Sequence, residues 1–235
     1  MTELGLFAKH WTPGEVKTRL AKDIGAAAAA QLHWAFLATL LRRLRRCGDR
    51  RVLVYSPADC ERDFADLAGE SWTCLPQADG DLGERLAAYF EQALARGARR
   101  VVLIGADSPN LPLAYLRQSF RLLEDRAVVL GPADDGGYYL VGAAESVPPI
   151  FSDIPWSTPQ VWPRTMERLA EAGISFATLP PWYDVDELSD LGRLREDVSQ
   201  AAKNDPDLAW LRFQIGEVTG PSAASAPVAV RRPPG

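Results

Sequence analysis

Strand-like and helix-like patterns of apolar residues alternate along most of this 235-residue chain. Residues 101–104 form a continuous apolar run, which is typical of a strand buried on both faces. Residues 25–46 predict a long helix, because leucines recur at the i, i+3, i+4, i+7 spacing of one buried face. Those leucines are Leu37, Leu40, Leu41 and Leu44. The alternation predicts an α/β fold with a mostly parallel central sheet flanked by helices.

The same analysis gives bounds for the other elements. Strands are expected at residues 2–8, 51–55, 72–75, 127–130, 138–142 and 174–179. Helices are expected at residues 58–67, 82–96, 112–124, 158–172 and 186–197. Four arginines near the end of the long helix are expected to form a solvated last turn, favoured by the helix dipole. They are Arg42, Arg43, Arg45 and Arg46.

The chain shows no linker or internal repeat before its last part, which predicts one domain over residues 1–200. Residues 201–219 are expected to form a peripheral extension with a small helix at 204–215. Residues 220–235 consist mainly of Pro, Ala, Ser and Val, a composition that predicts a disordered tail.

Composition narrows the function classes. The formal net charge of −5 argues against broad binding to nucleic acids or anionic membranes. The three cysteines, Cys47, Cys60 and Cys74, lack metal-ligand spacing and predict reduced thiols. With no signal-peptide pattern and no apolar run of membrane-spanning length, a cytoplasmic protein is expected. Only His10 and His33 offer imidazole chemistry, which argues against a catalytic triad.

The first apolar strand ends in a loop rich in lysine. Three of the four lysines of the chain, Lys9, Lys17 and Lys22, lie in this opening stretch, together with Arg19. Cations around the Pro13-Gly14 turn suit a group of anionic oxygens such as a diphosphate. A solvated basic loop is the alternative when the segment is taken alone.

Two carboxylates stand where a metal could bind at the edge of the sheet. Asp107 directly follows the most apolar strand, and ligands of open α/β sheets bind beyond the carboxyl ends of strands. Asp184 and Asp186 alternate on an extended segment, so both could face one ion. The alternatives are structural, since Asp107 could form a turn or cap a helix and Asp186 could cap the helix that follows.

Two further segments combine acids, glycines and an arginine. Asp134-Asp135-Gly136-Gly137 lies between two strand patterns, which is a hairpin signal. Two acids and two glycines exceed what a turn needs, which favours a role in binding, with an Asp directed into a cleft. In the segment at residues 80–86, Asp81 predicts a helix N-cap, and Arg85 could reach a phosphate or pair with an acid.

Taken in order, these segments resemble a family of bacterial GT-A-type transferases described as arsenosugar-biosynthesis-like glycosyltransferases. The matching stretches are Phe7-Ala8-Lys9, Pro13 to Leu20, Leu82-Gly83-Glu84-Arg85, Gly105-x-Asp107-x-Pro109, Gly131 to Leu140, Trp156-Ser157-Thr158 and Asp184-Val185-Asp186. Together they extend over residues 4–194. Trp11 stands where the family has Pro, and Glu187-Leu188 replaces Thr-Pro, but neither change removes a charged group.

The resemblance implies a Rossmann-like GT-A, or nucleotide-diphospho-sugar transferase, fold. The expected activity is metal-dependent transfer of a sugar from a nucleotide-diphospho-sugar donor to a small-molecule acceptor. A nucleotidyltransferase that releases pyrophosphate is the alternative, and a non-catalytic nucleotide-binding module is a third. By analogy, Asp107 and Asp186 would hold Mg²⁺ or Mn²⁺ against the donor phosphates. The oligomeric state stays open, with a homodimer as one option.

The remaining candidate residues divide into three roles. The nucleotide and its phosphates are assigned to Phe7, Ala8, Lys9, Gly14, Lys17, Arg19 and Arg85. The acceptor is assigned to Gly136, Gly137 and Tyr138. Asp135 or Asp134 is the candidate general base, and Lys17 is expected to stabilise the charge of the departing diphosphate.

Overall fold

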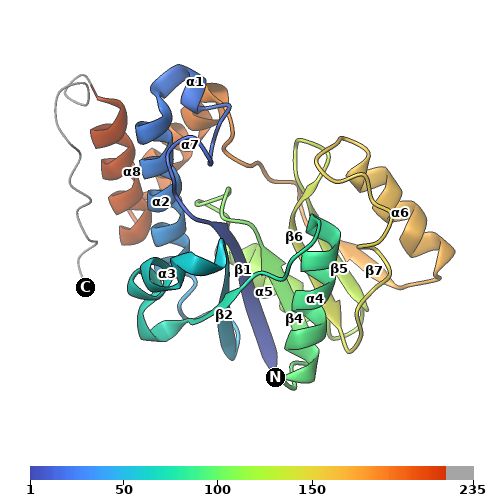
Figure 1. Ribbon diagram of the computed structural model, residues 1–235. Helices are drawn as coiled ribbons and strands as arrows, with labels where there is room; N and C mark the ends of the chain where they lie inside the picture. The colour runs from blue at the N-terminus through green and yellow to red at the C-terminus, as the bar shows by residue number, and fades with distance from the viewer. Residues whose placement is uncertain (221–235) are drawn as a thin grey trace. The chain divides into compact units, whose positions relative to one another are not determined.

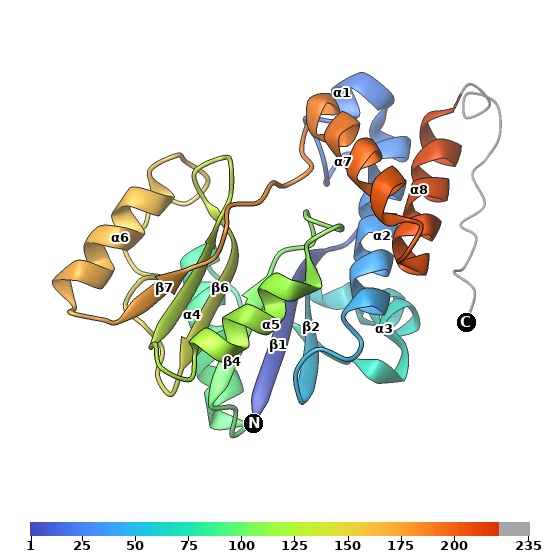
Figure 2. The ribbon, with the colours of Figure 1, turned by 180° about the vertical axis from the view of Figure 1, so that it is seen from behind.

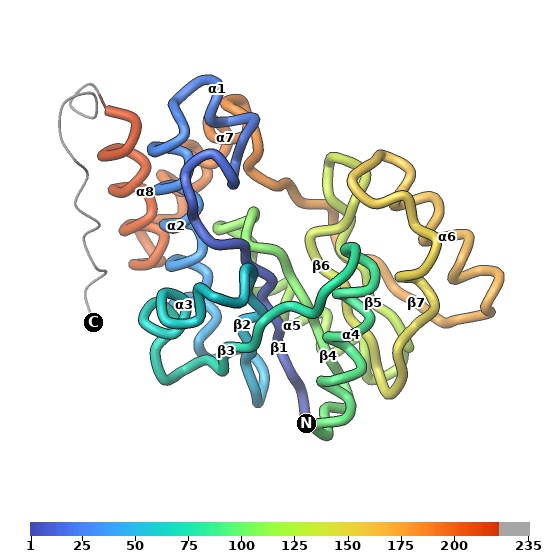
Figure 3. The backbone as a smooth tube through the Cα atoms, viewed as in Figure 1, coloured from blue at the N-terminus to red at the C-terminus, as the bar shows by residue number. Residues whose placement is uncertain are grey.

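The computed structural model describes residues 1–220, which form two compact units. Unit 1 comprises Met1–Ala8, Arg45–Gly105 and Leu111–Asp184. Unit 2 comprises Lys9–Leu44, Ala106–Asn110 and the described residues from Val185 onward. Figure 3 traces the chain through them. Of the predicted disordered tail, residues 221–235 lie outside the described residues.

Unit 1 is built on a seven-stranded sheet with the order β3-β2-β1-β4-β6-β5-β7. The strands are β1 (Thr2–Lys9), β2 (Arg50–Ser56), β3 (Thr73–Pro76), β4 (Arg100–Ile104), β5 (Val128–Pro132), β6 (Tyr138–Ala144) and β7 (Phe176–Thr178). Parallel pairs join β1 with β4, β2 with β3, and β5 with β7, whereas β6 runs antiparallel to β4 and β5. The predicted α/β fold with a mostly parallel sheet is confirmed.

Helices cover the sheet of unit 1. They are η1 (Ala58–Cys60), α3 (Glu61–Ala68), η2 (Gly69–Ser71), α4 (Leu82–Ala95), α5 (Leu113–Leu122) and α6 (Val161–Glu171). α4 and α5 lie on opposite faces of the sheet, as the two opposed views show (Figures 1 and 2). Each apolar residue of β4 is therefore at most 2% exposed, which explains its continuous apolar run.

Unit 2 is mainly helical. Its helices are α1 (Ala21–Ile24), α2 (Ala26–Arg43), α7 (Leu188–Ala201) and α8 (Pro206–Thr219). α2 packs against α1 and α8, and α8 also packs against α7 (Figure 2). All four leucines of the predicted apolar face of α2 are buried, so that prediction is confirmed. Within residues 1–220, none of the helices combines the length and apolarity that a membrane span needs.

The arginines at the end of α2 differ from their prediction. The side chain of Arg43 is only 5% exposed, and its Nε lies 3.0 Å from Asp205 Oδ2. Its Nη1 also donates a hydrogen bond to the carbonyl of Pro109. Arg42 Nε lies 2.8 Å from Asp207 Oδ1. The prediction of a solvated last turn is therefore wrong for these two, because the start of α8 supplies acids that pair with them. Arg45 and Arg46 are exposed, as expected.

One buried carboxylate links the first strand of unit 1 to its surroundings. Glu3 in β1 is fully buried, and its Oε1 accepts hydrogen bonds from Arg96 Nη2 at 2.8 Å and from the Tyr89 hydroxyl at 3.1 Å. Arg50 Nη1 lies 3.3 Å from Glu3 Oε2. Burial and the nearby Glu3 raise the pKa of Tyr89, so its hydroxyl remains a donor. A buried charge needs this full set of partners.

Replacing Glu3 with Gln is expected to lower the free energy of unfolding by about 2 kcal/mol, because charge-assisted hydrogen bonds are lost in a buried site. Urea unfolding measures this change. Glu167→Gln is the matched control, since Glu167 pairs with Arg164 at 2.8 Å on the surface of α6. An exposed pair contributes little, so the control should stay within about 0.5 kcal/mol of the wild type. Equal losses in both variants would contradict the assigned role of Glu3.

The start of α4 is fixed by a capping box and by a glycine contact. Asp81 caps the helix as predicted, accepting from the Glu84 N–H at 2.9 Å while Glu84 Oε2 accepts from the Asp81 N–H at 2.8 Å. A Cβ at Gly83 would lie 2.1 Å from the Phe151 carbonyl oxygen and 2.6 Å from Trp156 Nε1. Only glycine fits there without a shift of the 151–156 segment.

Gly83→Ala is expected to destabilise the protein by about 1–3 kcal/mol through overpacking. Gly192→Ala is the control, since Gly192 also lies in a helix but a Cβ there would meet no neighbouring atom within 4 Å. There, the higher helix propensity of alanine predicts no loss, or a gain of up to about 1 kcal/mol. Thermal unfolding of both variants tests the contrast, and a stable Gly83→Ala protein would refute the packing argument.

Candidate active site

The loop after β1 is shaped by its Pro-Gly turn. The Glu15 N–H donates to the Thr12 carbonyl at 3.1 Å, and Gly14 has φ +87°, which suits a turn that needs a left-handed residue. Lys9 Nζ donates to the Glu15 carbonyl at 2.9 Å. Gly14 and Lys9 therefore both shape this loop of unit 2. Their predicted contact with phosphate remains a prediction.

Lys17 brings the two predicted metal ligands together. Its Nζ contacts Asp107 Oδ1 directly and lies 3.0 Å from Asp186 Oδ1. The Lys17 side chain is 2% exposed, whereas the side chains of Asp107 and Asp186 are 42% and 41% exposed. Lys17 Nζ also lies 5.9 Å from the centroid of the Phe36 ring, within the range of a cation–π contact. All four residues belong to unit 2.

The backbone holds the two acids in register. The Val185 N–H donates to the Asp107 carbonyl at 2.9 Å, so the segments that carry Asp107 and Asp186 are hydrogen-bonded directly.

Neither acid caps a helix. α5 begins after Pro112 without a side-chain cap, and α7 is capped by Glu187 and Asp190. The structural alternatives proposed for Asp107 and Asp186 as helix caps are therefore wrong.

Electrostatic interactions within this trio favour the charged forms of Lys17 and Asp107. Burial opposes the charge on Lys17, but Asp107 and Asp186 outweigh it and raise the pKa of the ammonium. Desolvation likewise opposes ionisation of Asp107, yet the nearby Lys17 ammonium holds the pKa of that carboxyl below its ordinary value. One ammonium thus faces two carboxylates.

His33 adjoins the trio, and the sequence alone did not assign it to the site. Its side chain is 5% exposed, and burial lowers its pKa, so the ring is neutral near pH 7. Nε2 lies 2.9 Å from the Lys9 carbonyl oxygen, which can only accept, so Nε2 carries the hydrogen. Nδ1 is buried without a hydrogen-bond partner among the described residues, 3.9 Å from Asp107 Oδ1. The only sequence feature that could have pointed to His33 is its place within an apolar helical stretch.

This donor set fits a hard divalent cation. Asp107 and Asp186 offer carboxylate oxygens from partly exposed side chains, and Mg²⁺ is bound in proteins by one or two carboxylates plus water and substrate phosphates. The buried lone pair of His33 Nδ1 beside Asp107 is consistent with a cation or a water at this point. The residues that would hold the ion are Asp107 and Asp186.

Arg19 is an exposed cation of this region. Its side chain is 66% exposed, and Nη1 lies 3.8 Å from Glu187 Oε1, at the long end of an ion pair. Such a pair between exposed side chains contributes little and is readily exchanged. Among the loop cations, Arg19 is therefore available to an anionic ligand, whereas Lys17 is enclosed by its two acids.

Gln77 links two of the other predicted nucleotide-binding residues, Ala8 and Arg85, in unit 1. The Gln77 side-chain amide donates to the Ala8 carbonyl at 3.3 Å and to the Val54 carbonyl at 3.1 Å. Arg85 donates through Nη1 to Gln77 Oε1 at 3.4 Å and through Nε to the Gly80 carbonyl at 2.8 Å. Phe7 packs edge-on against Tyr89. Gln77 thus joins the end of β1 to the Leu82–Arg85 motif, a link that the sequence did not indicate.

The predicted acceptor segment forms the hairpin between β5 and β6 in unit 1. Asp135 Oδ1 accepts from the Gly137 N–H at 2.9 Å. Gly136 has φ +92°, and a Cβ there would lie 2.9 Å from Pro159 Cα. The hairpin interpretation is confirmed. Asp134 and Asp135 are both exposed, and their proposed role as general base remains a prediction.

Tyr138 follows this hairpin and packs edge-on against Trp156, with 6.0 Å between ring centroids. Burial raises the pKa of its hydroxyl, so Tyr138 remains protonated. Its ring belongs to the periphery of the apolar core of unit 1. Tyr138 therefore has a packing role in the structure, in addition to the predicted contact with an acceptor.

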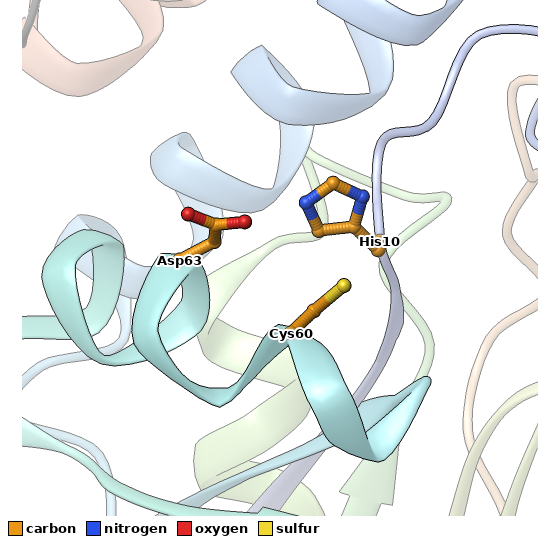
Figure 4. Close-up of side chains that lie close together, drawn as sticks. All are labelled: His10, Cys60 and Asp63. Atoms are coloured by element: carbon orange, nitrogen blue, oxygen red, sulfur yellow. The ribbon is translucent and has the colours of Figure 1, made fainter.

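Figure 4 shows His10, Cys60 and Asp63. Cys60 ends η1 and Asp63 lies in α3, both in unit 1. His10 belongs to unit 2, where its ring stacks on Trp11 at 4.4 Å between ring centroids and its Nδ1 lies 2.8 Å from Thr12 Oγ1.

Cys47, Cys60 and Cys74 form no disulfide, in agreement with the prediction of thiols.

Comparison with solved structures identifies the fold. A "putative nucleotide-diphospho-sugar transferase" from Desulfovibrio desulfuricans G20 matches with a TM-score of 0.84 and 31% identity, covering 92% of this chain and 96% of that one. A nucleotidyl transferase from Methanothermobacter thermautotroptrophicus matches at 0.57 and 18% identity, covering 86% and 99% of the two chains. A cytidylyltransferase from Leptospira borgpetersenii matches at 0.55 and 12% identity, covering 98% and 99%. The last two likenesses concern the fold alone.

Comparison by sequence gives the family. A search of curated proteins found no match. A family model described as "Uncharacterized protein conserved in bacteria (DUF2064)" matches residues 39–158, which is just over half of the chain. The chain therefore belongs to this bacterial family, and it has the fold of the nucleotide-diphospho-sugar transferases.

Proposed function

We propose that this protein is a metal-dependent glycosyltransferase that uses a nucleotide-diphospho-sugar donor and a small-molecule acceptor. The observation that carries the proposal is the convergence of Asp107 and Asp186 on one point in unit 2. Support also comes from the 31% identical relative, which is described as a "putative nucleotide-diphospho-sugar transferase".

The charge of the site supports a dication as part of this proposal. Asp107 and Asp186 contribute two negative charges and Lys17 one positive charge, so the trio carries one net negative charge. A diphosphate would be repelled by this charge. Bound Mg²⁺ or Mn²⁺ would supply positive charge that stabilises the departing nucleoside diphosphate. Asp107 and Asp186 would hold the ion, and His33 adjoins Asp107.

The chain's own residues then have separable roles in this proposal. Arg19 binds the diphosphate from the exposed side of the loop, with Lys9 and Gly14 shaping the backbone beside it. Arg85, Phe7 and Ala8, which lie in unit 1, are assigned to the nucleotide. Gly136, Gly137 and Tyr138 position the acceptor, and Asp135 or Asp134 removes its proton as the new bond forms.

A nucleotidyltransferase is the second candidate. The specific observation in its favour is the shared fold with a nucleotidyl transferase and a cytidylyltransferase. The same carboxylates would then hold the metal of a nucleoside triphosphate, and pyrophosphate would leave. Because these two likenesses are at 18% and 12% identity, the 31% identical relative weighs more heavily. A non-catalytic nucleotide-binding module remains the third candidate.

A donor screen separates these functions. The protein is incubated with a panel of nucleotide sugars or nucleoside triphosphates and Mn²⁺ or Mg²⁺, and the released phosphate species is identified by mass spectrometry. We expect slow release of nucleoside diphosphate from one nucleotide sugar, even without the acceptor. Pyrophosphate from a triphosphate would favour the nucleotidyltransferase. Tight binding without turnover of any donor would favour the binding module.

Substitution of the proposed metal ligands tests the carboxylate pair. Asp107→Asn and Asp186→Asn are each expected to reduce donor turnover by about 100-fold or more, the scale seen when one group that stabilises transition-state charge is removed. Glu91→Gln removes an exposed acid from α4 and should leave turnover unchanged. Thermal unfolding confirms that each variant is folded. Full turnover by a folded Asp107→Asn protein would exclude the proposed metal site.

A further inference from the structure

Lys17 occupies the position on which the two proposed metal ligands converge. Its Nζ contacts one oxygen of Asp107 and lies 3.0 Å from one oxygen of Asp186. Without a cation, two carboxylates this close would repel each other. In this structure the ammonium supplies the counter-charge that a dication would otherwise supply.

The backbone at Lys17 supports a specific role for this side chain. Lys17 has φ 48°, in the left-handed region that favours glycine, although a lysine stands there. The Ala21 N–H donates to its carbonyl at 2.8 Å, which ties this conformation to the start of α1. The conformation directs a 2% exposed side chain, which lies over Phe36, onto both acids. A loop that needed only a bend at this point would be better served by glycine.

We propose that Lys17 is a resident counter-cation that competes with the divalent metal for Asp107 and Asp186, so that the metal binds tightly only together with a nucleoside diphosphate. This inference rests on the proposed function. It gives Lys17 a positioning and regulatory role at the acids, in addition to the phosphate contact that the sequence suggests.

The sign of the effect follows from charge. A dication meets two negative charges and one positive charge in the wild type, but two negative charges alone when Lys17 is neutralised. Removing the ammonium should therefore strengthen binding of the metal by itself. A diphosphate reverses the disadvantage in the wild type, because its oxygens ligate the metal and also give the displaced ammonium a new partner. Arg19, which is largely exposed, can bind the same anion.

Manganese binding measures this competition without any turnover. Free Mn²⁺ is quantified by electron paramagnetic resonance while it is titrated with the wild type, Lys17→Met or Lys22→Met. Methionine keeps an unbranched side chain against Phe36, and Lys22 is an exposed lysine of the same region that has no ion pair within the described residues. Lys17→Gln is a second neutral variant in case Lys17→Met does not fold, and thermal unfolding reports the folded state.

We expect Lys17→Met to bind Mn²⁺ alone at least ten times more tightly than the wild type, and Lys22→Met to match the wild type. Addition of GDP or UDP should increase Mn²⁺ affinity more in the wild type than in Lys17→Met. Unchanged or weaker Mn²⁺ binding by the folded neutral variants would overturn the inference.

The failure of this inference is distinguishable from the failure of the proposed function. If Mn²⁺ binds and Asp107→Asn abolishes that binding, but Lys17→Met leaves the affinity unchanged, only the competition is refuted and the metal site stands. If Mn²⁺ binds neither the wild type nor the Lys17 variants, with or without GDP or UDP, the inference and the metal dependence of the proposed function both fail.

Discussion

The pairing of one enclosed ammonium with two carboxylates organises unit 2. Lys17, Asp107 and Asp186 come from three segments that are far apart in the sequence. An ammonium that is 2% exposed is stable only because both acids compensate its charge. The acids in turn remain partly exposed, so the cluster combines a buried cation with anionic oxygens that ligands can reach. A polar cluster of this kind specifies how the lysine loop, the Asp107 segment and the start of α7 meet.

The fold could be predicted because its main patterns have simple physical causes. The apolar run at Val101 to Ile104 is buried on both faces, and the leucines of α2 face the interior of unit 2. The Asp-Gly pair of the hairpin and the Asp81 cap follow local rules that need no tertiary information. Even the antiparallel hairpin in a mostly parallel sheet is visible in the sequence.

The tertiary partners of charged residues could not be predicted in the same way. The sequence predicted a solvated helix end at Arg42 and Arg43. In the structure, the start of α8 places Asp207 and Asp205 beside them. The sequence analysis grouped Lys17 with the segments that carry Asp107 and Asp186, but it did not indicate that the Lys17 side chain is buried. His33 was counted as one of two imidazoles but was not assigned to the site. Each depends on contacts between residues that are distant in the chain, which local patterns do not encode.

The hydrogen bond from the Val185 N–H to the Asp107 carbonyl has a mechanical consequence. It joins the peptide that precedes Asp186 to the peptide that carries Asp107, so the two carboxylates share one backbone frame. A movement of the start of α7, which follows Asp186, would carry the Asp107 segment with it. The spacing between the carboxylate oxygens of Asp107 and Asp186 would then change little. The two segments whose carboxylates would hold a cation are therefore coupled through the backbone as well as through Lys17.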